Sequence, residues 1–437
     1  MGGIRRFATT ASLLAAAASV LALALFLGSE VLLDDPVIHA RSTADLRLDL
    51  EGIEAERDLA IERIAVRAIS NGRLFGTQDH YLFVSDDFGE TFVRKGVFPK
   101  LDPGLLERVR DRVARHPAVR RIRGLPGPMN VVVLHSGTVL VFYDRIYRSP
   151  DGGERFIPLV TPVDSLYGPA PLHAVAVDPE DRVFYGEYLT GERPNTVRIV
   201  RGTEDGTRWE ICHTFGPGEV YHVHSVSWDP WGGRLLVATG DRDEESGIWE
   251  LDPECSGVRL VSGGEQRWRI IAPLFTDAFV LWGSDDDQAG SDIWRKRRGT
   301  KELEHLHRIG SPSYDATRLL DGSFVVSTTY EPDSRFTSAF DPEPASELWF
   351  SRDAENWHRL DHFVWVEEIH GWGRARARAL LPWSDGSSPY LFVVPDSTED
   401  GFVTYRYRVE ALPASGASHT TAEAENGQRE GASRPAP

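Results

Sequence analysis

The sequence predicts an all-β chain folded as a β-propeller of seven blades, with six blades as the alternative. A short turn pattern returns along the chain, and each copy follows a strand that carries an apolar pair. Seven such pairs lie 45 to 64 residues apart, about the length of a four-stranded blade with its loops. The pairs begin at Leu82, Ile146, Ile199, Ile248, Ile293, Leu348 and Phe402.

The turn pattern is a serine or threonine, then an aspartate, a glycine and an aromatic residue. Its four copies cover residues 85–92, 149–156, 203–209 and 351–357, and the last lacks the glycine. The aspartate can accept hydrogen bonds from turn amides, the glycine supplies a positive φ, and the aromatic ring packs under the turn. We expect these turns, called box turns below, to join the third and fourth strands of their blades.

The box turns resemble the Asp-box (BNR repeat) of sialidase-like β-propellers. Over roughly residues 60 to 410, the chain resembles an uncharacterised bacterial and archaeal group of these proteins. The matching segments are Gly186-Glu187-Tyr188, His222-Val223-His224, Asp229-Pro230 and Thr239-Gly240-Asp241. This resemblance implies the propeller fold and carries no established reaction.

The N-terminal residues 1–33 are predicted to be a membrane anchor or signal peptide. Arg5 and Arg6 precede an uncharged run from Ala8 to Gly28, which is long enough to span the hydrocarbon core of a membrane. We favour an anchored, extracytoplasmic propeller, with a cleaved secreted form as the alternative. The rest divides into a linker or lead-in (34–60), the propeller (61–411) and a disordered tail (412–437).

A short helical insertion is predicted between the first and second units, from Pro103 to Arg123. Leu105, Leu106 and Val109 recur there at helical spacing. The insertion accounts for the longest of the spacings between units.

The two cysteines, Cys212 and Cys255, fall near the ends of units three and four. They could form a disulfide or remain two separately buried thiols, and the sequence leaves both open. Neither has the spacing of a metal-binding or redox pair.

The net charge of −18 argues against a nucleic-acid-binding surface. We expect a glycan or a protein as the ligand, and a membrane contact through the N-terminal segment. The sequence gives no indication of the oligomeric state.

One strand pattern occurs twice, from His173 to Pro179 and from His224 to Pro230. In a propeller the first strand of each blade lines the central channel, so these histidines should stand at equivalent positions. The next strand of units three, four and five ends in an acidic residue. Antiparallel neighbours return to the end where the first strand began, so these acids should face the same opening.

The candidate catalytic residues are Glu187, Asp241 and Asp285; the candidate ligand-binding residues are His173, Tyr188, His222, His224, Arg269 and Arg318.

His222 and His224 are two apart on a strand and so point to the same face, and together with His173 and Asp241 they could ligate a metal. A hydrogen-bonded network that braces the inner strands is the more frequent use of such residues in propellers. We therefore expect no metal and no other cofactor.

Two function classes remain open. The first is a membrane-tethered propeller that binds a glycan or protein ligand. The second is a glycoside hydrolase or lyase that acts on an anionic sugar, with arginines on the inner strands, such as Arg67 and Arg378, as a possible carboxylate clamp. The Arg-Ile-Pro motif of true sialidases is absent, so whether the chain is an enzyme stays open and the binding function is favoured.

Overall fold

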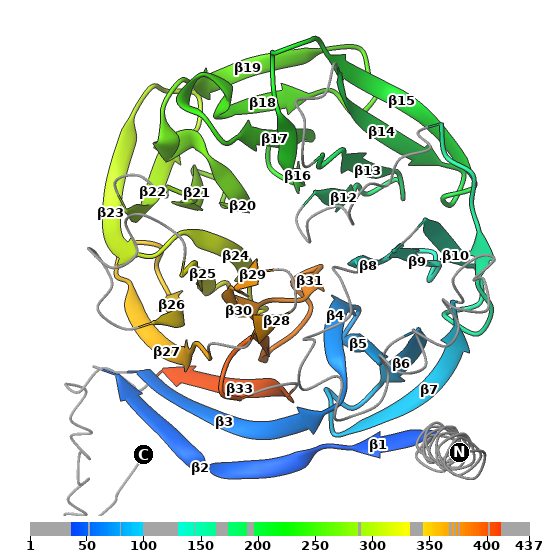
Figure 1. Ribbon diagram of the computed structural model, residues 1–437, viewed down its shortest axis with the longest axis vertical. Coiled ribbons are helices and arrows are strands. Elements are labelled where there is room, and N and C mark those ends of the chain that lie inside the picture. The colour runs from blue at the N-terminus through cyan, green and yellow to red at the C-terminus, as the bar shows by residue number, and fades with distance from the viewer. Residues whose placement is uncertain are drawn as a thin grey trace, which may run out of the picture.

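A computed structural model describes residues 36–50, 53–78, 80–98, 130–143, 145–162, 174–189, 196–286, 290–332, 344–366, 369–370, 373–374, 376–400 and 403–411. These residues form a β-propeller around a central axis (Figure 1), as the sequence predicts. The N-terminal segment 1–33, the insertion 103–123 and the tail 412–437 lie outside the described residues. Within the part of the chain that is described, no helix is both long and apolar enough to cross a membrane.

The described strands make seven antiparallel blades, each with its first strand nearest the axis. Blade one contains β4 (Ala65–Ser70), β5 (Arg73–Gln78), β6 (Tyr81–Ser85) and β7 (Thr91–Val97). Blade two contains β8 (Asn130–Val133), β9 (Val139–Phe142), β10 (Ile146–Ser149) and β11 (Ile157–Pro158). Blade three contains β12 (Val175–Val177), β13 (Val183–Gly186), β14 (Val197–Thr203) and β15 (Arg208–Phe215).

The next three blades repeat this arrangement, and two 3-10 helices, η2 (Asp243–Glu245) and η3 (Gln266–Trp268), lie between their strands. Blade four contains β16 (His222–Asp229), β17 (Arg234–Gly240), β18 (Gly247–Leu251) and β19 (Val258–Gly263). Blade five contains β20 (Ile270–Phe275), β21 (Phe279–Ser284), β22 (Ser291–Arg297) and β23 (Leu303–Gly310). Blade six contains β24 (Ser313–Arg318), β25 (Phe324–Tyr330), β26 (Ala345–Ser351) and β27 (His358–Val364).

Blade seven takes strands from both ends of the chain. Its strands are β30 (Ala377–Leu380), β32 (Leu391–Asp396), β33 (Val403–Ala411) and β3 (Ile53–Glu62), with β2 (Arg41–Leu50) outside them. A further strand, β1 (Val37–His39), pairs with β7 of blade one. The described residues of the segment 34–60, expected to be a lead-in, therefore contribute strands to the propeller. The physical reason is that β33 would otherwise present an unpaired sheet edge.

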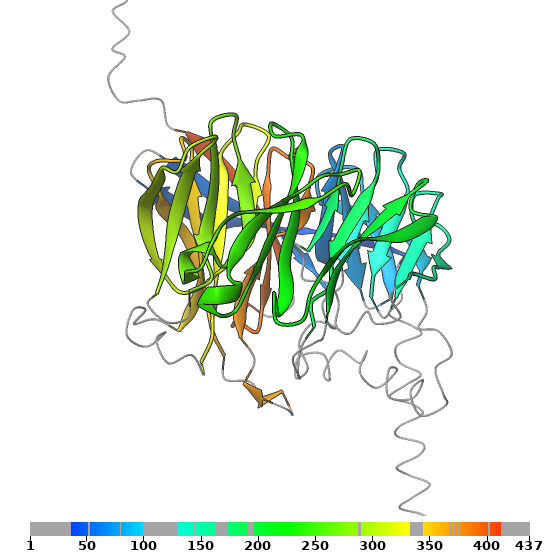
Figure 2. The ribbon, with the colours of Figure 1, turned by 90° about the horizontal axis from the view of Figure 1, so that it is seen from above.

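The inner strands all begin on the same side of the disc, which we call the entry face. Figure 2 shows the disc edge-on, with the orange hairpin of β28 (Ile369–His370) and β29 (Gly373–Arg374) projecting on this side, just before β30. A short strand, β31 (Trp383–Ser384), runs parallel to β4. Because neighbouring strands are antiparallel, the second strand of each blade ends on the entry face.

The box turns join the third and fourth strands of blades one, two, three and six, as expected. In the first, Asp87 Oδ1 accepts hydrogen bonds from the Ser85 hydroxyl at 2.7 Å and from the Thr91 amide at 2.9 Å. Gly89 has a φ of 92°, which L-residues rarely adopt. The turn therefore needs its aspartate and its glycine for the reasons that the sequence suggests.

The core lies between neighbouring blades. Phe142 of blade two packs edge-on against Tyr185 and Trp209 of blade three, with ring centroids 5.7 Å and 6.4 Å away. Trp209 is the aromatic residue of the third box turn. Its ring therefore fastens the turn and also fills the space between two blades.

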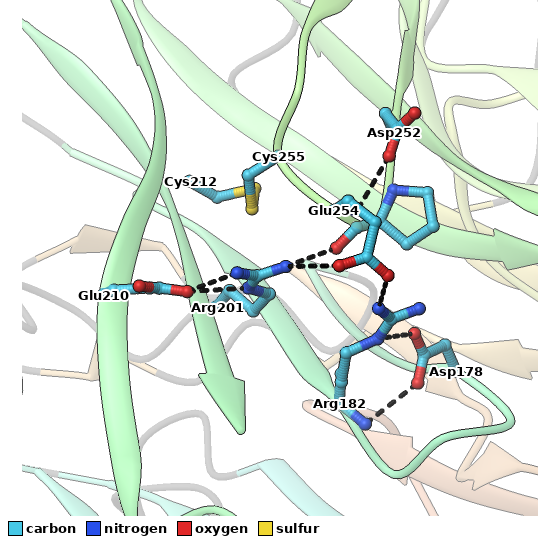
Figure 3. Close-up of a disulfide and its surroundings, with 9 residues drawn as sticks. Asp178, Arg182, Arg201, Glu210, Cys212, Asp252, Glu254 and Cys255 are labelled. Carbon is cyan, nitrogen blue, oxygen red and sulfur yellow. Dashed lines mark hydrogen bonds and ion pairs between the residues drawn. A yellow bond between two sulfur atoms is a disulfide. The ribbon is translucent and has the colours of Figure 1, made fainter. Parts of the chain in front are cut away.

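A disulfide links blades three and four at their outer edge (Figure 3). It joins Cys212 in β15 to Cys255 in the turn between β18 and β19, so the bridged alternative is the one the structure adopts. Beside it, Arg201 donates to the Pro253 carbonyl at 2.7 Å and pairs with Glu210. Closing a chain loop with a disulfide removes entropy from the unfolded state.

The box turns yield a first prediction. Burial works against ionisation of Asp87, but the Thr91 amide and the Ser85 hydroxyl outweigh it, so the pKa of this carboxyl lies below its usual value. Asp87→Ala should lower the free energy of unfolding at neutral pH by about 1 kcal/mol. A depressed folded-state pKa gives stability that is present above the unfolded value and lost in acid. The difference from the parent should therefore shrink as the pH falls below about 4, measured by urea unfolding across pH.

The matched control is Asp86→Ala in the same turn. Asp86 pairs with Arg73 at the surface, where both side chains are largely exposed, and such pairs contribute little. An equal loss of stability in both variants, or a loss for Asp87→Ala that does not depend on pH, would contradict this account of the turn.

Candidate functional site

Three polar side chains of blade four meet on the entry face. His222 and His224 lie at the start of β16, and Asp241 directly follows β17. The two Nε2 atoms are 2.7 Å apart, and Asp241 Oδ1 lies 3.2 Å from the first and 3.3 Å from the second. Both histidines are buried, with 2 % and 1 % of their surface exposed. The sequence correctly predicts that these three residues come together.

A β-bulge sets the position of His224. Val223 pairs with Thr239 and Ser225 pairs with Ala238, so His224 is the extra residue between them. The same irregularity makes Arg67 the extra residue of β4 in blade one, and Tyr314 the extra residue of β24 in blade six. Bulges re-aim side chains and are common beside active sites. In three blades, therefore, the extra residue near the start of the inner strand carries a polar side chain.

Blade three supplies the surroundings of His222. The Nδ1 atom of His222 lies 3.1 Å from the Leu189 carbonyl oxygen. A carbonyl can only accept, so this nitrogen carries a proton and donates it. The Tyr188 ring stacks on the imidazole with centroids 4.0 Å apart and an interplanar angle of 24°. Tyr188, predicted to bind ligand, therefore lies at this cluster. These contacts fix the ring and direct Nε2 of His222 toward His224 and Asp241.

Arg269 lies between two of the predicted acids. Its Nε is 3.0 Å from Asp285 Oδ2, and its Nη2 is 3.5 Å from Asp241 Oδ1. The sequence predicts mutual repulsion of carboxylates here unless an arginine neutralises them, and Arg269 takes that role. The side chains of Asp285 and Arg269 are mostly buried, which strengthens their attraction.

The protonation states follow from burial and contacts. Burial lowers the pKa of His224 to about 3, although its contact with Asp241 works in the opposite direction. Burial alone would raise the pKa of Asp241, but the two imidazoles outweigh it and hold that pKa well below the usual range. At neutral pH the cluster therefore contains a neutral His224 and an ionised Asp241.

The third predicted acid, Glu187, is held apart from the cluster. Its Oε2 accepts hydrogen bonds from the Arg198 amide at 2.8 Å and from Arg198 Nε at 3.0 Å. Its Oε1 is buried and has no hydrogen-bond partner among the described residues. Glu187 is thus an ion-paired residue beside the histidine cluster, not a partner of Asp241.

Two predicted ligand-binding residues do not join the cluster. Arg318 is the last residue of β24 and lies on the face opposite the entry face, where it contacts Trp231 and Phe324. The sequence places Arg318 on an inner strand without showing at which end, and the structure corrects its expected position at this opening. His173 lies outside the described residues.

A second polar cluster forms where blades one, six and seven adjoin. Arg378 in β30 pairs with Asp396 and donates to the Tyr314 hydroxyl at 3.2 Å. Arg67 is only 3 % exposed, and its one hydrogen bond within the described part of the chain runs from Nε to Thr77 Oγ1, at 3.2 Å. The charges of Asp396 and Arg378 both affect the pKa of Arg67, so the two arginines share one carboxylate. We call Arg67, Tyr314, Arg378 and Asp396 the arginine cluster.

Burial lowers the pKa of Arg67 to about 10, with Asp396 opposing and Arg378 adding to the shift. Arg67 remains charged at neutral pH. The sequence suggests Arg67 and Arg378 only as two of several inner-strand arginines, because neither the bulge nor the missing counterion can be read from it.

Tyr188 connects the two clusters, since its pKa is raised first by burial and then by Asp241, Asp285 and Tyr314.

Comparisons with known proteins support the fold alone. No family model matches the chain, and no curated protein matches its sequence. An oligogalacturonate lyase in complex with manganese is similar in structure at a TM-score of 0.51 and 10 % identity, covering 87 % of this chain and 98 % of that one.

Two further structures are less similar. YCF48 from Cyanidioschyzon merolae has a TM-score of 0.44 at 13 % identity, covering 83 % of this chain and 98 % of that one. The GH74 enzyme of Niastella koreensis has a TM-score of 0.40 at 14 % identity, covering 65 % and 46 %. These proteins are β-propellers, and no sialidase or BNR family is shown.

The close contact of blades three and four yields a second prediction. A Cβ added to Gly186 would lie 2.4 Å from the Cβ of Val223. Val223 is the residue of β16 that separates the two histidines in the sequence. Gly186→Ala should therefore push the blades apart and lower the free energy of unfolding by about 1–3 kcal/mol. Gly257→Ala is the control, because its added Cβ meets nothing within 4 Å. Chemical unfolding of both variants checks this, and equal stabilities would contradict it.

Proposed function

We propose that this chain is an extracytoplasmic ligand-binding propeller that takes a carboxylate-bearing glycan on its entry face. The observation that carries the proposal is Arg67, a buried cation with no carboxylate of its own among the described residues. Burying a charge is costly unless it is paired. A ligand carboxylate would supply the missing partner. The four box turns further support a divergent Asp-box propeller.

The charge balance of the arginine cluster favours a single carboxylate. Arg67 and Arg378 carry two positive charges, and Asp396 carries one negative charge. The planar guanidinium fork matches a carboxylate in a bidentate manner. A monoanion neutralises the remaining charge, whereas a dianionic phosphate would leave the cluster negative.

The acidic net charge of −18 does not prevent such binding. At physiological ionic strength, charges separated by more than about 8 Å of solvent are largely screened. The local arginines therefore dominate over distant surface acids once the ligand is near. We expect the glycan to associate slowly, because electrostatic steering is weak. Once bound, it should be held by the buried contact between its carboxylate and the arginines.

A glycan is favoured over other carboxylates by the aromatic side chains at the histidine cluster on the same face. Tyr188 stacks on His222, and Tyr221 lies 4.8 Å from the same imidazole. Aromatic rings beside a polar cluster can contact the apolar face of a sugar. One propeller neighbour is named an oligogalacturonate lyase, but its likeness concerns the fold only.

The alternative, a glycoside hydrolase or lyase acting on the same ligand, has less support. Glycosidic cleavage needs one carboxylic acid that stays protonated and one that stays ionised. Asp241 stays ionised and shares Arg269 with Asp285. Glu187 likewise pairs with Arg198, and an arginine beside a carboxyl favours its ionised form, which does not suit a proton donor.

The location outside the cytoplasm rests on the N-terminal uncharged run and on the disulfide. Disulfides form and persist in oxidising compartments, and Cys212 is bonded to Cys255. We expect that protease added to intact cells digests the propeller while a cytoplasmic marker survives. Protection of the propeller until the cells are lysed would contradict this location.

The ligand proposal predicts opposite effects of one substitution on binding and on stability. Arg67→Met removes a buried charge that has no counterion of its own, so the melting temperature should stay the same or rise. On an array of acidic and neutral glycans, the same variant should bind each acidic glycan at least about tenfold more weakly than the parent. Titration calorimetry on the free glycan and on its methyl ester then measures the contribution of the carboxylate.

Arg318→Met is the matched control, because this arginine lies on the opposite face. It should bind every glycan as the parent does. Equal binding of acid and methyl ester, or parent-like binding by Arg67→Met, would refute the proposal. Products appearing in the glycan mixture would instead favour the enzyme.

A further inference from the structure

We infer that His222, His224 and Asp241 bind one divalent transition-metal ion. This site is separate from the arginine cluster and does not rest on the glycan proposal. It departs from the expectation drawn from the sequence, in which these residues brace the inner strands without a metal.

The three atoms have the spacing of a coordination sphere. Ligand atoms about 2.0–2.1 Å from a tetrahedral ion lie about 3.3 Å from one another. Asp241 Oδ1 lies 3.2 Å and 3.3 Å from the two Nε2 atoms. The Nε2 atoms, 2.7 Å apart, need to separate by about 0.6 Å, which a small rotation of either ring provides.

The ligand atoms of the three side chains all lie within 4.8 Å of one another. Each of them can offer a lone pair to a cation. The Leu189 carbonyl lies beside the other ring nitrogen of His222, so Nε2 of that ring is the atom directed at the cluster. Both imidazoles are buried, so an ion between them would be shielded from water.

The donor set indicates the class of metal. Two imidazoles and one carboxylate suit zinc, manganese, cobalt or iron, whereas calcium and magnesium take oxygen ligands. The Leu189 carbonyl holds the outer nitrogen of His222, and Arg269 contacts the Asp241 carboxylate. Such contacts orient metal ligands in proteins. Three protein ligands leave a further coordination position for water or for a ligand.

The experiment uses the full chain, treated with chelator and dialysed. Zinc, manganese and cobalt chlorides are titrated by calorimetry, with calcium and magnesium chlorides for comparison. We expect one equivalent of a transition metal to bind and the melting temperature to rise with its concentration. The visible spectrum of the cobalt form should show the bands of nitrogen and oxygen ligands. Asp241→Asn, which keeps the side-chain shape, and His224→Gln should each bind at least about 100-fold more weakly.

The matched control is His305→Gln, which removes an imidazole that lies 3.1 Å from Asp292. His305 and Asp292 belong to no metal-binding group of three side chains among the described residues, so metal affinity should be unchanged. The inference fails if the parent binds none of the three metals, or if the cluster variants bind as tightly as His305→Gln. The titration is independent of the Arg67 variants, so either proposal can fail while the other stands.

Discussion

The pairing of β3 with β33 closes the propeller, and the entry face depends on this closure. The register runs from Ile53 opposite Ala411 to Glu62 opposite Val403. Beneath it, the buried Arg406 pairs with Asp58 at 2.7 Å, which adds a charged contact between the two ends of the chain. Closure sets blade seven beside blade one. The arginine cluster therefore exists only in the closed ring, and opening the ring would remove the proposed carboxylate site.

Most charged groups on the entry face have partners close at hand. Glu187 is held by Arg198, and Asp285 is held by Arg269. Two places stand out on the described part of this face: Arg67 has no carboxylate of its own among the described residues, and the imidazoles of His222 and His224 face each other. Folded proteins satisfy nearly all buried polar groups, so exceptions indicate function or a missing ion. The exceptions are of opposite kinds, because one attracts an anion and the other a cation.

The fold was largely predictable from the sequence, because the box turns and apolar pairs repeat with the blade. The N-terminal strands of blade seven were not, because their partner β33 lies at the other end of the chain. For the site, the His222, His224 and Asp241 cluster followed from strand alternation and antiparallel return. Arg318 was misplaced because its end of the strand was unknown. Arg67 could not be singled out among 48 basic residues, because a missing counterion is a property of the folded chain.

The most direct measurement is a crystal structure of the full chain with manganese and an acidic glycan selected on the array, recorded with anomalous scattering. The account predicts an anomalous peak within bonding distance of the two Nε2 atoms and Asp241 Oδ1. It also predicts the glycan carboxylate on the Arg67 guanidinium, on the same face. A glycan bound near Arg318 on the opposite face, with Arg67 still lacking an anion, would contradict the account.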